Sequence, residues 1–134
     1  MVHPSEKLLR DFYAAQGRLY AGEAEVDEVS GLLSDEIVWH VPGRNAIAGD
    51  YRGKREVLDY FARRRDKARG SFRIEVRRVL ADEEFVIQLA GGQAEIDGNL
   101  HEWETVGVYR VANGRIAECW LVPFDQLAFD EIWA

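Results

Sequence analysis

The sequence predicts an α+β domain in which three helices precede a mostly antiparallel sheet. Up to Gly70, apolar residues recur at three- and four-residue spacing, which is typical of amphipathic helices. From Phe72 onward they alternate with polar residues instead, as they do in strands. The pairs Asp97-Gly98 and Asn113-Gly114 interrupt this alternation and are typical of tight β-hairpins.

Two helices are expected at the N-terminus. The first should span residues 5–21, with Ser5 as its N-cap and Gly22 just beyond its end. The acidic stretch that begins at Glu23 leads into a shorter second helix. The apolar residues of the first helix are Leu9, Phe12, Tyr13, Leu19 and Tyr20, and those of the second are Val26, Val29, Leu32 and Leu33.

A strand and a third helix follow. Residues 37–41 are β-branched or aromatic and precede a Pro-Gly pair, which predicts a strand. A loop is expected from there to Gly53. The third helix should run from Lys54 to about Lys67 and end before Gly70. Its apolar residues are Val57, Leu58, Phe61 and Ala62.

The two hairpin turns predict the register of the remaining strands. If each Asx-Gly pair forms a two-residue type I′ turn, Val106 faces Leu89 on one side and Leu121 on the other. This register gives the sheet two apolar faces. One carries Ile87, Leu89, Val106, Val108, Cys119 and Leu121 and continues to Gln93, Glu102 and Glu104. The other carries Trp103, Thr105, Tyr109, Trp120, Val122 and Phe124.

A sheet with two apolar faces needs two covers, and three short helices can supply only one. We therefore expect the aliphatic face to pack on the helices and the aromatic face to pack against a second copy of the chain. The residues of this homodimer interface would be Trp103, Tyr109, Trp120 and Val122. The alternative is the opposite assignment, in which the face of Trp103 and Trp120 forms the core of the monomer.

Length and charge restrict the class of protein. The 134 residues, of which 47% are apolar, fit one folded domain. A net charge of −7 argues against a nucleic-acid partner, because phosphate binding needs clustered positive charge. Arg63, Arg64 and Arg65 lie in the most basic part of the chain. We interpret them as a solvated helix face, and the alternative is recognition of an acidic partner.

The sequence also predicts a cytoplasmic protein without a membrane partner. No apolar run approaches the roughly 20 residues that cross a bilayer, and the first residues lack the apolar centre of a signal peptide. The single cysteine, Cys119, cannot form an internal disulfide. The histidines share no metal-ligand spacing and no phosphate-binding glycine loop occurs, so neither a metal nor a cofactor is expected.

The order of these elements, with the segments LLSDEIVWHVPG, AGDYRGKREVLDYF and VYRVANGRIAECW, resembles the nuclear transport factor 2-like superfamily, in particular its SnoaL-like and ketosteroid isomerase-like branch. The resemblance covers nearly the whole chain and implies a single SnoaL-like domain over residues 1–134. It implies a cone in which a curved, mixed sheet wraps around three N-terminal helices and encloses an apolar pocket. Members pair through the outer sheet face, and they include isomerases, polyketide cyclases, epoxide hydrolases and binding proteins.

The catalytic residues of ketosteroid isomerase have no counterpart in kind. Its general base falls on Val41, or on His40 if the alignment slips by one position. Its oxyanion-binding tyrosine falls near Ala15 and its protonated aspartate near Val106 or Gly107. We therefore expect binding of a hydrophobic, cyclic small molecule, with cofactor-free isomerase, cyclase or epoxide hydrolase chemistry. The alternative is a non-catalytic binding or assembly module of the same fold.

Three ionisable residues are candidates for proton transfer. Glu104 lies on the predicted inner face, where apolar walls would raise its pKa, unless it is an ordinary charge at the rim. His40 ends the first strand and could act as a base, unless it points away from the cone. Asp125 could orient a water, or it could cap a short C-terminal helix. The expected ligand-binding residues are Tyr13, Gln16, Trp39, Val41, Phe61, Leu89, Val106 and Leu121.

Overall fold

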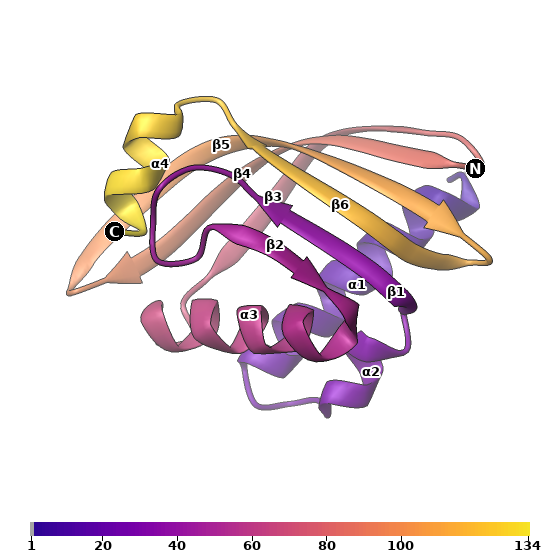
Figure 1. Ribbon diagram of the computed structural model, residues 1–134, viewed down its shortest axis with the longest axis horizontal. Coiled ribbons are helices and arrows are strands. Elements are labelled where there is room, and N and C mark those ends of the chain that lie inside the picture. Colours follow the sequence, from indigo (N-terminus) through magenta and orange to yellow (C-terminus); the bar gives the residue numbers. More distant parts are fainter. Residues whose placement is uncertain (1) are drawn as a thin grey trace.

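The chain forms one six-stranded sheet that curves around its helices (Figure 1). The computed structural model describes residues 2–134. The helices are α1 (Pro4–Tyr20), α2 (Val26–Ser30), α3 (Gly53–Lys67) and α4 (Gln126–Ile132). The strands are β1 (Leu33–Val41), β2 (Gly49–Arg52), β3 (Arg73–Ala81), β4 (Phe85–Ile96), β5 (Asn99–Ala112) and β6 (Arg115–Pro123).

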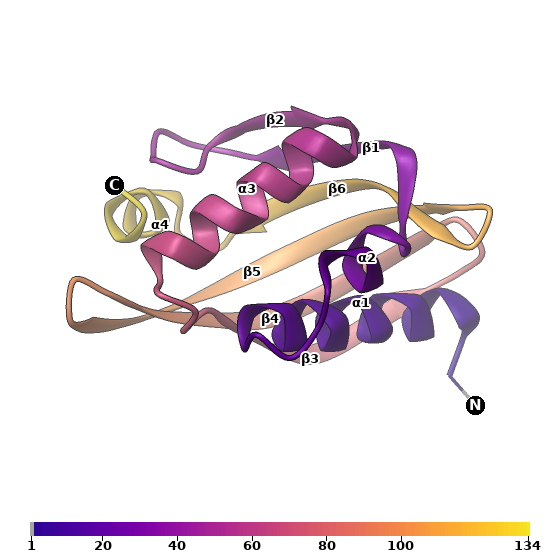
Figure 2. The same cartoon turned by 90° about the horizontal axis from the view of Figure 1, so that it is seen from below.

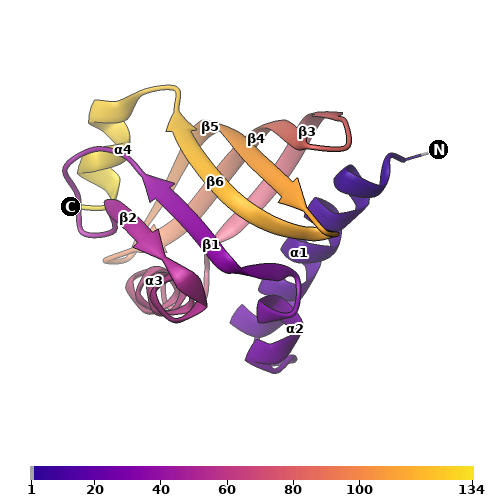
Figure 3. The ribbon, with the colours of Figure 1, turned by 45° about the vertical axis from the view of Figure 1, so that its right-hand side comes forward.

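The strand order is β2-β1-β6-β5-β4-β3, and every neighbouring pair is antiparallel except β1 and β6. Helices α1, α2 and α3 lie on the same side of the sheet, and α4 lies at one end of it (Figures 2 and 3). This arrangement confirms the predicted cone of a mixed sheet around three N-terminal helices. Within residues 2–134, no helix is both long and apolar enough to cross a bilayer.

The predicted helices are confirmed to within a few residues, and their details differ at three points. The N-cap of α1 is His3 rather than Ser5, because Pro4 occupies the first turn and the His3 ring accepts a hydrogen bond from the Ser5 N–H. The second helix ends at Ser30, so that Leu33 already belongs to β1. The expected loop before α3 contains the short strand β2, in which Tyr51 pairs with Trp39.

The two hairpins turn at the predicted places. Asp97 and Asn113 both have a φ of 53°, and the glycines that follow them have φ values of 81° and 73°. Positive φ at both central positions is what a type I′ turn requires. The pairing of Leu89 with Val106 across the first hairpin is confirmed.

The register of the second hairpin differs from the prediction by one residue. Val111 pairs with Ile116 as expected, but Arg110 pairs with Glu118, so that Ala117 is an extra residue in β6. This β-bulge shifts every later pair, and Tyr109 rather than Val108 lies opposite Cys119. A two-residue turn alone cannot predict such an insertion.

The predicted assignment of the sheet faces is wrong for β4 and β5 and correct for β6. Tyr109 and Thr105 are each 2% exposed and face the helices, whereas Leu89 is 41% exposed on the opposite face. Cys119 of β6 lies inside as expected. The alternative assignment is half right, because Trp103 packs inside and Trp120 lies outside.

The predicted dimer residues consequently fall on two different faces. Tyr109 is buried in the interior of the monomer, and the half-buried Trp103 packs on the inner face against Trp133. Trp120 and Val122 remain on the outer face. The same face also carries aliphatic side chains of β4 and β5, which are Ile87, Leu89, Val106 and Val108.

An aromatic cluster centred on Trp39 fills the space between the sheet and the helices. Its indole is 3% exposed, and its ring centroid lies 5.0 Å from that of Phe61 and 5.7 Å from that of Phe12. Tyr60 and Tyr109 complete its surroundings at 6.3 and 5.9 Å. Trp39 therefore joins α1, α3 and β5 in one core.

Candidate functional site

A cavity of about 30 Å³ lies within this core, between α1, α3, α4 and the inner face of the sheet. Its size suits one or two water molecules. The walls are mainly aromatic and carry a few polar side chains. The lining residues are Phe12, Tyr13, Gln16, Trp39, Ile47, Tyr60, Arg64, Phe72, Ile74, Gln88, Trp103, Thr105, Tyr109, Leu121, Phe129 and Trp133.

Three polar groups from different elements meet at one side of the cavity. The hydroxyl groups of Tyr13 in α1 and Tyr109 in β5 lie 2.5 Å apart and share a hydrogen bond. The amide nitrogen of Gln88 in β4 donates to the Tyr13 hydroxyl and lies 3.4 Å from that of Tyr109. These groups form a cluster, the Tyr13–Gln88–Tyr109 cluster, that can hold an oxygen atom by hydrogen bonds.

The titratable groups of the cavity remain in their protonated forms near neutral pH. Burial raises the pKa values of Tyr13 and Tyr109 above the ordinary range of a phenol, and it raises that of Tyr60 to about 12. Burial likewise raises the pKa of the Cys119 thiol. The tyrosines are thus hydrogen-bond donors rather than bases.

Glycines on the inner face make room for these side chains. A Cβ atom at Gly107 would lie 2.8 Å from the Tyr109 ring and 2.9 Å from the Gln88 amide nitrogen. A Cβ atom at Gly92 would lie 2.3 Å from the Trp103 indole, a separation that forces the ring to move. Glycine at these two positions lets the polar cluster and the Trp103 ring lie directly on the sheet.

Helix α4 supplies the last wall of the cavity. Phe129 and Trp133 pack on Trp103 with ring centroids 6.0 and 5.6 Å away. The helix is attached to the loop after β1, because the Asp130 carboxylate accepts a hydrogen bond of 2.7 Å from Asn45. Asp125 caps its N-terminus by accepting from the Ala128 N–H at 3.1 Å.

Four buried side-chain nitrogen and oxygen atoms within residues 2–134 lack a hydrogen-bond partner. All four belong to residues that line the cavity. They are Gln16 Nε2, Arg64 Nε, Gln88 Oε1 and Trp133 Nε1. Buried polar atoms in folded proteins are nearly always paired, so a group of orphans in one place needs an explanation. Three of the four are nitrogen donors, which a ligand or a water with acceptor oxygens would satisfy.

The predicted ligand-binding residues divide into three groups. Tyr13, Gln16, Trp39 and Leu121 line the cavity. Phe61 and Val41 are buried in the surrounding core without lining it. Leu89 and Val106 lie on the outer face, because the side chains of β4 and β5 point the opposite way from the prediction.

The three candidates for proton transfer lie outside the cavity. The Glu104 side chain is 43% exposed on the outer face, where it pairs with Arg77, and this pairing lowers its pKa. Asp125 is an exposed helix cap. His40 also points away from the cone. The structure therefore matches the alternative interpretations, in which Glu104 is a surface charge, Asp125 is a helix cap and His40 points outward.

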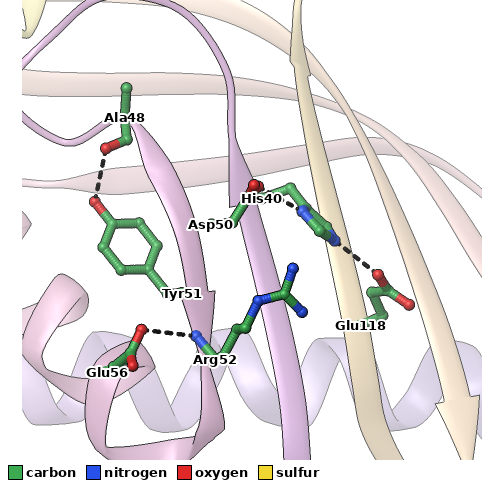
Figure 4. Close-up of polar contacts among 7 residues, drawn as sticks. All are labelled: His40, Ala48, Asp50, Tyr51, Arg52, Glu56 and Glu118. Atoms are coloured by element: carbon green, nitrogen blue, oxygen red, sulfur yellow. Dashed lines mark hydrogen bonds and ion pairs between the residues drawn. The ribbon is translucent and has the colours of Figure 1, made fainter.

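His40 instead lies between two carboxylates of the outer face (Figure 4). Its Nδ1 lies 2.7 Å from Asp50 of β2, and its Nε2 lies 2.7 Å from Glu118 of β6. The imidazole stacks on Trp120 with ring centroids 5.5 Å apart. Partial burial lowers the pKa of His40, but the hydrogen bonds to Glu118 and Asp50 outweigh it, so that the net shift is upward.

This upward shift predicts a pH-dependent contribution of His40 to stability. A histidine with a raised pKa in the folded state stabilises most below its unfolded pKa of about 6.5 and loses this effect as pH rises through the folded value. We expect urea unfolding to show that His40→Gln lowers the free energy of unfolding by roughly 0.5–1 kcal/mol at pH 5.5, and by less at pH 8.5. His101→Gln is the control, since His101 makes no ion pair in the described chain. An equal loss at both pH values would contradict the prediction.

Sequence analysis missed Arg64, Gln88 and Tyr109 as site residues. Arg64 was assigned to a solvated face, although it follows Val57 and Phe61 at helical spacing and is 6% exposed. Helical spacing could have placed it inside. Gln88 and Tyr109 could be placed in the site only with the correct assignment of the inner sheet face. The small residues near them were the only sign of that assignment in the sequence.

The comparisons with known proteins give the family. The SnoaL-like domain family matches residues 9–119. The chain belongs to the SnoaL-like family. No curated protein sequence matches it. The match confirms the predicted SnoaL-like family.

Solved structures support the same fold for this SnoaL-like domain. Bal32a, from a soil-derived mobile gene cassette, is 27% identical with a TM-score of 0.88, over 98% of this chain and 97% of that one. TerC, co-crystallised with polyporic acid, is 16% identical with a TM-score of 0.79, over 96% and 97%. A proposed isomerase from Rhodopseudomonas palustris is 19% identical with a TM-score of 0.77, over 93% of each chain.

Proposed function

We propose that this protein binds a hydrophobic, cyclic small molecule inside the cone, through a ligand oxygen that accepts hydrogen bonds from the Tyr13–Gln88–Tyr109 cluster. The orphaned polar atoms carry the proposal that a ligand lies in the cavity, since all four belong to residues that line it. A protein core without a ligand gains nothing from unpaired donors, whereas a binding site needs them.

The walls of the cavity favour a flat ring as the ligand. Trp39, Phe72 and Trp103 are among the aromatic residues that line it. Aromatic side chains pack well against a cyclic molecule, and the few polar groups would fix its orientation. TerC, which has this fold, was co-crystallised with polyporic acid, which supports a small molecule as a ligand of such a domain.

Ligand binding requires the walls to move apart. A cavity of about 30 Å³ is far smaller than the ~300 Å³ or more of pockets that hold small molecules. The partly exposed residues Ile74, Trp103 and Leu121 line it on the sheet side and are the side chains best placed to move. The proposed ligand would take their place against the aromatic core.

Isomerase-type chemistry is the second candidate function, and the tyrosine pair favours it. One proton of the pair lies in the hydrogen bond between the two hydroxyls, which leaves one O–H free to donate to a ligand oxygen. Such a neutral donor can stabilise negative charge that develops on that oxygen during a reaction. The lining residues contain neither a carboxylate nor an imidazole, so a base would have to come from the ligand or the solvent. Binding without turnover is therefore the function that the site supports better.

Tyr109→Phe tests the proposal. The purified protein would be incubated with cyclic enones, cyclic epoxides and aromatic esters, and thermal shift, product mass and retention time would be recorded. For a compound that binds the wild type, Tyr109→Phe should weaken binding by about three- to tenfold, as expected for the loss of one hydrogen bond. Tyr51→Phe is the matched control, because its hydroxyl is buried on the Ile47 carbonyl away from the cavity.

The outcomes separate the two functions. Binding by the wild type that weakens only in Tyr109→Phe supports the proposed site. Conversion of a compound by the wild type that is lost in Tyr109→Phe would instead make the protein an enzyme. Equal weakening in both tyrosine variants, or no binding of any compound, would contradict the proposal.

We also propose that the outer sheet face joins two copies of the chain. Ile87, Leu89 and Val122 are 40%, 41% and 49% exposed at its centre, and exposed apolar patches with a polar rim are typical of interfaces. The rim carries both signs, with Arg77 on β3 and Glu118 on β6. In a two-fold symmetric dimer, the positive part of each rim can face the negative part of the other rim. A second copy of the chain therefore fits this face.

A further inference from the structure

Arg64 is a buried cation without a buried anion. It is 6% exposed, and no aspartate or glutamate is buried anywhere in residues 2–134. Buried charges in proteins are nearly always paired, because removing an ion from water costs several kcal/mol. We propose that the missing negative charge is supplied by the ligand, which would be a cyclic organic acid bound beside the Arg64 guanidinium. This inference rests on the proposed function and specifies the chemical class of the ligand.

The position of the guanidinium is fixed by neutral groups only. Its two terminal nitrogens donate to the hydroxyls of Tyr60 and Tyr20 at 2.9 and 3.0 Å. The Tyr20 hydroxyl in turn donates to the Phe61 carbonyl oxygen, so that it is fully used. These contacts hold the side chain in place and leave its charge uncompensated.

Aromatic rings surround the same guanidinium. Its central carbon lies 4.0 Å from the centroid of Phe72, 5.0 Å from that of Tyr60 and 5.2 Å from that of Phe61. Such cation–π contacts reduce the cost of burying the charge, and they do not neutralise it. The arrangement is a preformed cationic site inside an apolar wall.

The third nitrogen of the Arg64 guanidinium has no partner within the described residues. Its Nε is buried and unpaired, and the residue lines the cavity. Gln16 Nε2 and Trp133 Nε1 are further unpaired donors on the walls of this cavity. A carboxylate accepts several hydrogen bonds at once, and its bonds to a charged donor are about twice as strong as neutral ones. An anion therefore fits this donor set better than a ketone or an alcohol.

Matched pairs of probes distinguish a charged from a neutral ligand. We would titrate the protein with 2-naphthoate and 2-naphthamide, and with benzoate and benzamide as a smaller pair, by isothermal calorimetry at neutral pH. Within each pair the size is nearly the same and only the acid is charged. The wild type should bind the carboxylate at least about tenfold more tightly than the amide.

Substitutions on α3 assign this preference to one residue. Arg64→Met should bring the two affinities within about threefold of each other, while Arg64→Lys should retain part of the preference because it keeps the charge. Arg63→Met is the matched control, since Arg63 is exposed on the same helix over the Tyr51 ring. Its preference should equal that of the wild type. If Arg64→Met does not fold, the reduced preference of Arg64→Lys provides the test.

The two proposals fail in different ways. If the wild type binds carboxylate and amide equally, the inference about Arg64 is wrong and the proposed binding function stands. A preference that persists in Arg64→Met would also overturn it, because another group would then hold the charge. If no probe binds, the proposed function fails together with the inference.

Discussion

Trp39→Ala is expected to lower the free energy of unfolding by about 3–5 kcal/mol, the range for removal of a large aromatic side chain from a core. Trp39 is 3% exposed and packs on rings of α1, α3 and β5, so its loss would leave a cavity that three elements would have to fill. The loss is a large fraction of the total stability of a typical domain, about 5–15 kcal/mol. Urea unfolding, followed by circular dichroism, measures it directly.

Phe124→Ala is the control for this prediction. Phe124 is 64% exposed beyond the end of β6, and its replacement should change the free energy of unfolding by about 0.5 kcal/mol or less. A loss of less than about 1 kcal/mol in Trp39→Ala would mean that the aromatic cluster does not carry the fold.

Trp120→Glu is expected to dissociate the proposed dimer completely. The substitution places a negative charge opposite Val108 on the proposed interface, where its desolvation opposes association. The folded monomer should persist, because Trp120 lies outside the core. Sedimentation velocity or gel filtration over a range of concentrations would report the change in mass.

The matched control for this substitution is Leu127→Glu. Leu127 is 77% exposed on α4, away from the outer face of the sheet, so the same charge there should leave the dimer intact. A wild type that is monomeric at all concentrations would contradict the dimer itself. A dimer that survives Trp120→Glu would place the interface elsewhere.

The sequence predicts the elements and the family of this protein well, because local patterns decide them. Helical spacing predicts α1 and α3, and the Asx-Gly pairs predict both hairpin turns, where the φ values are positive as required. The β-bulge at Ala117 is different in kind. It lies in β6, between β1 and β5, and no local pattern indicates an extra residue there.

The site was harder to predict than the fold because its residues break the rule that hydrophobic side chains lie inside. On β4 and β5 the inner face carries Gln88, Thr105 and Gly107, while the aliphatic side chains Ile87 and Leu89 face outward. A binding cavity needs space and hydrogen-bond donors, so small and polar residues replace large apolar ones there. The alternation of residues along the strands and their hydrophobicity therefore disagree at the candidate site, and functional sites are where such rules are expected to fail.

Arg64 shows the same conflict on a helix. Three consecutive arginines are typical of a solvated surface, yet Arg63 is exposed and Arg64 is buried among aromatic rings. The helical period predicts this difference, whereas the charge of the residue argues against it. Only the three-dimensional surroundings show which of the two effects decides.

The small volume of the cavity affects the time course of binding. Because the Trp103 ring lies on Gly92 and packs against Trp133, a ligand would have to wait for these side chains to separate. The observed association rate of the proposed ligand would then level off at high concentration, at the rate of opening, instead of rising in proportion to concentration. The observed affinity would also be lower than that of the open form, in proportion to the fraction of molecules that are open. A substitution that loosens this contact would increase the fraction of open molecules, so that both the association rate and the affinity would depend on how tightly the indole is held against the sheet.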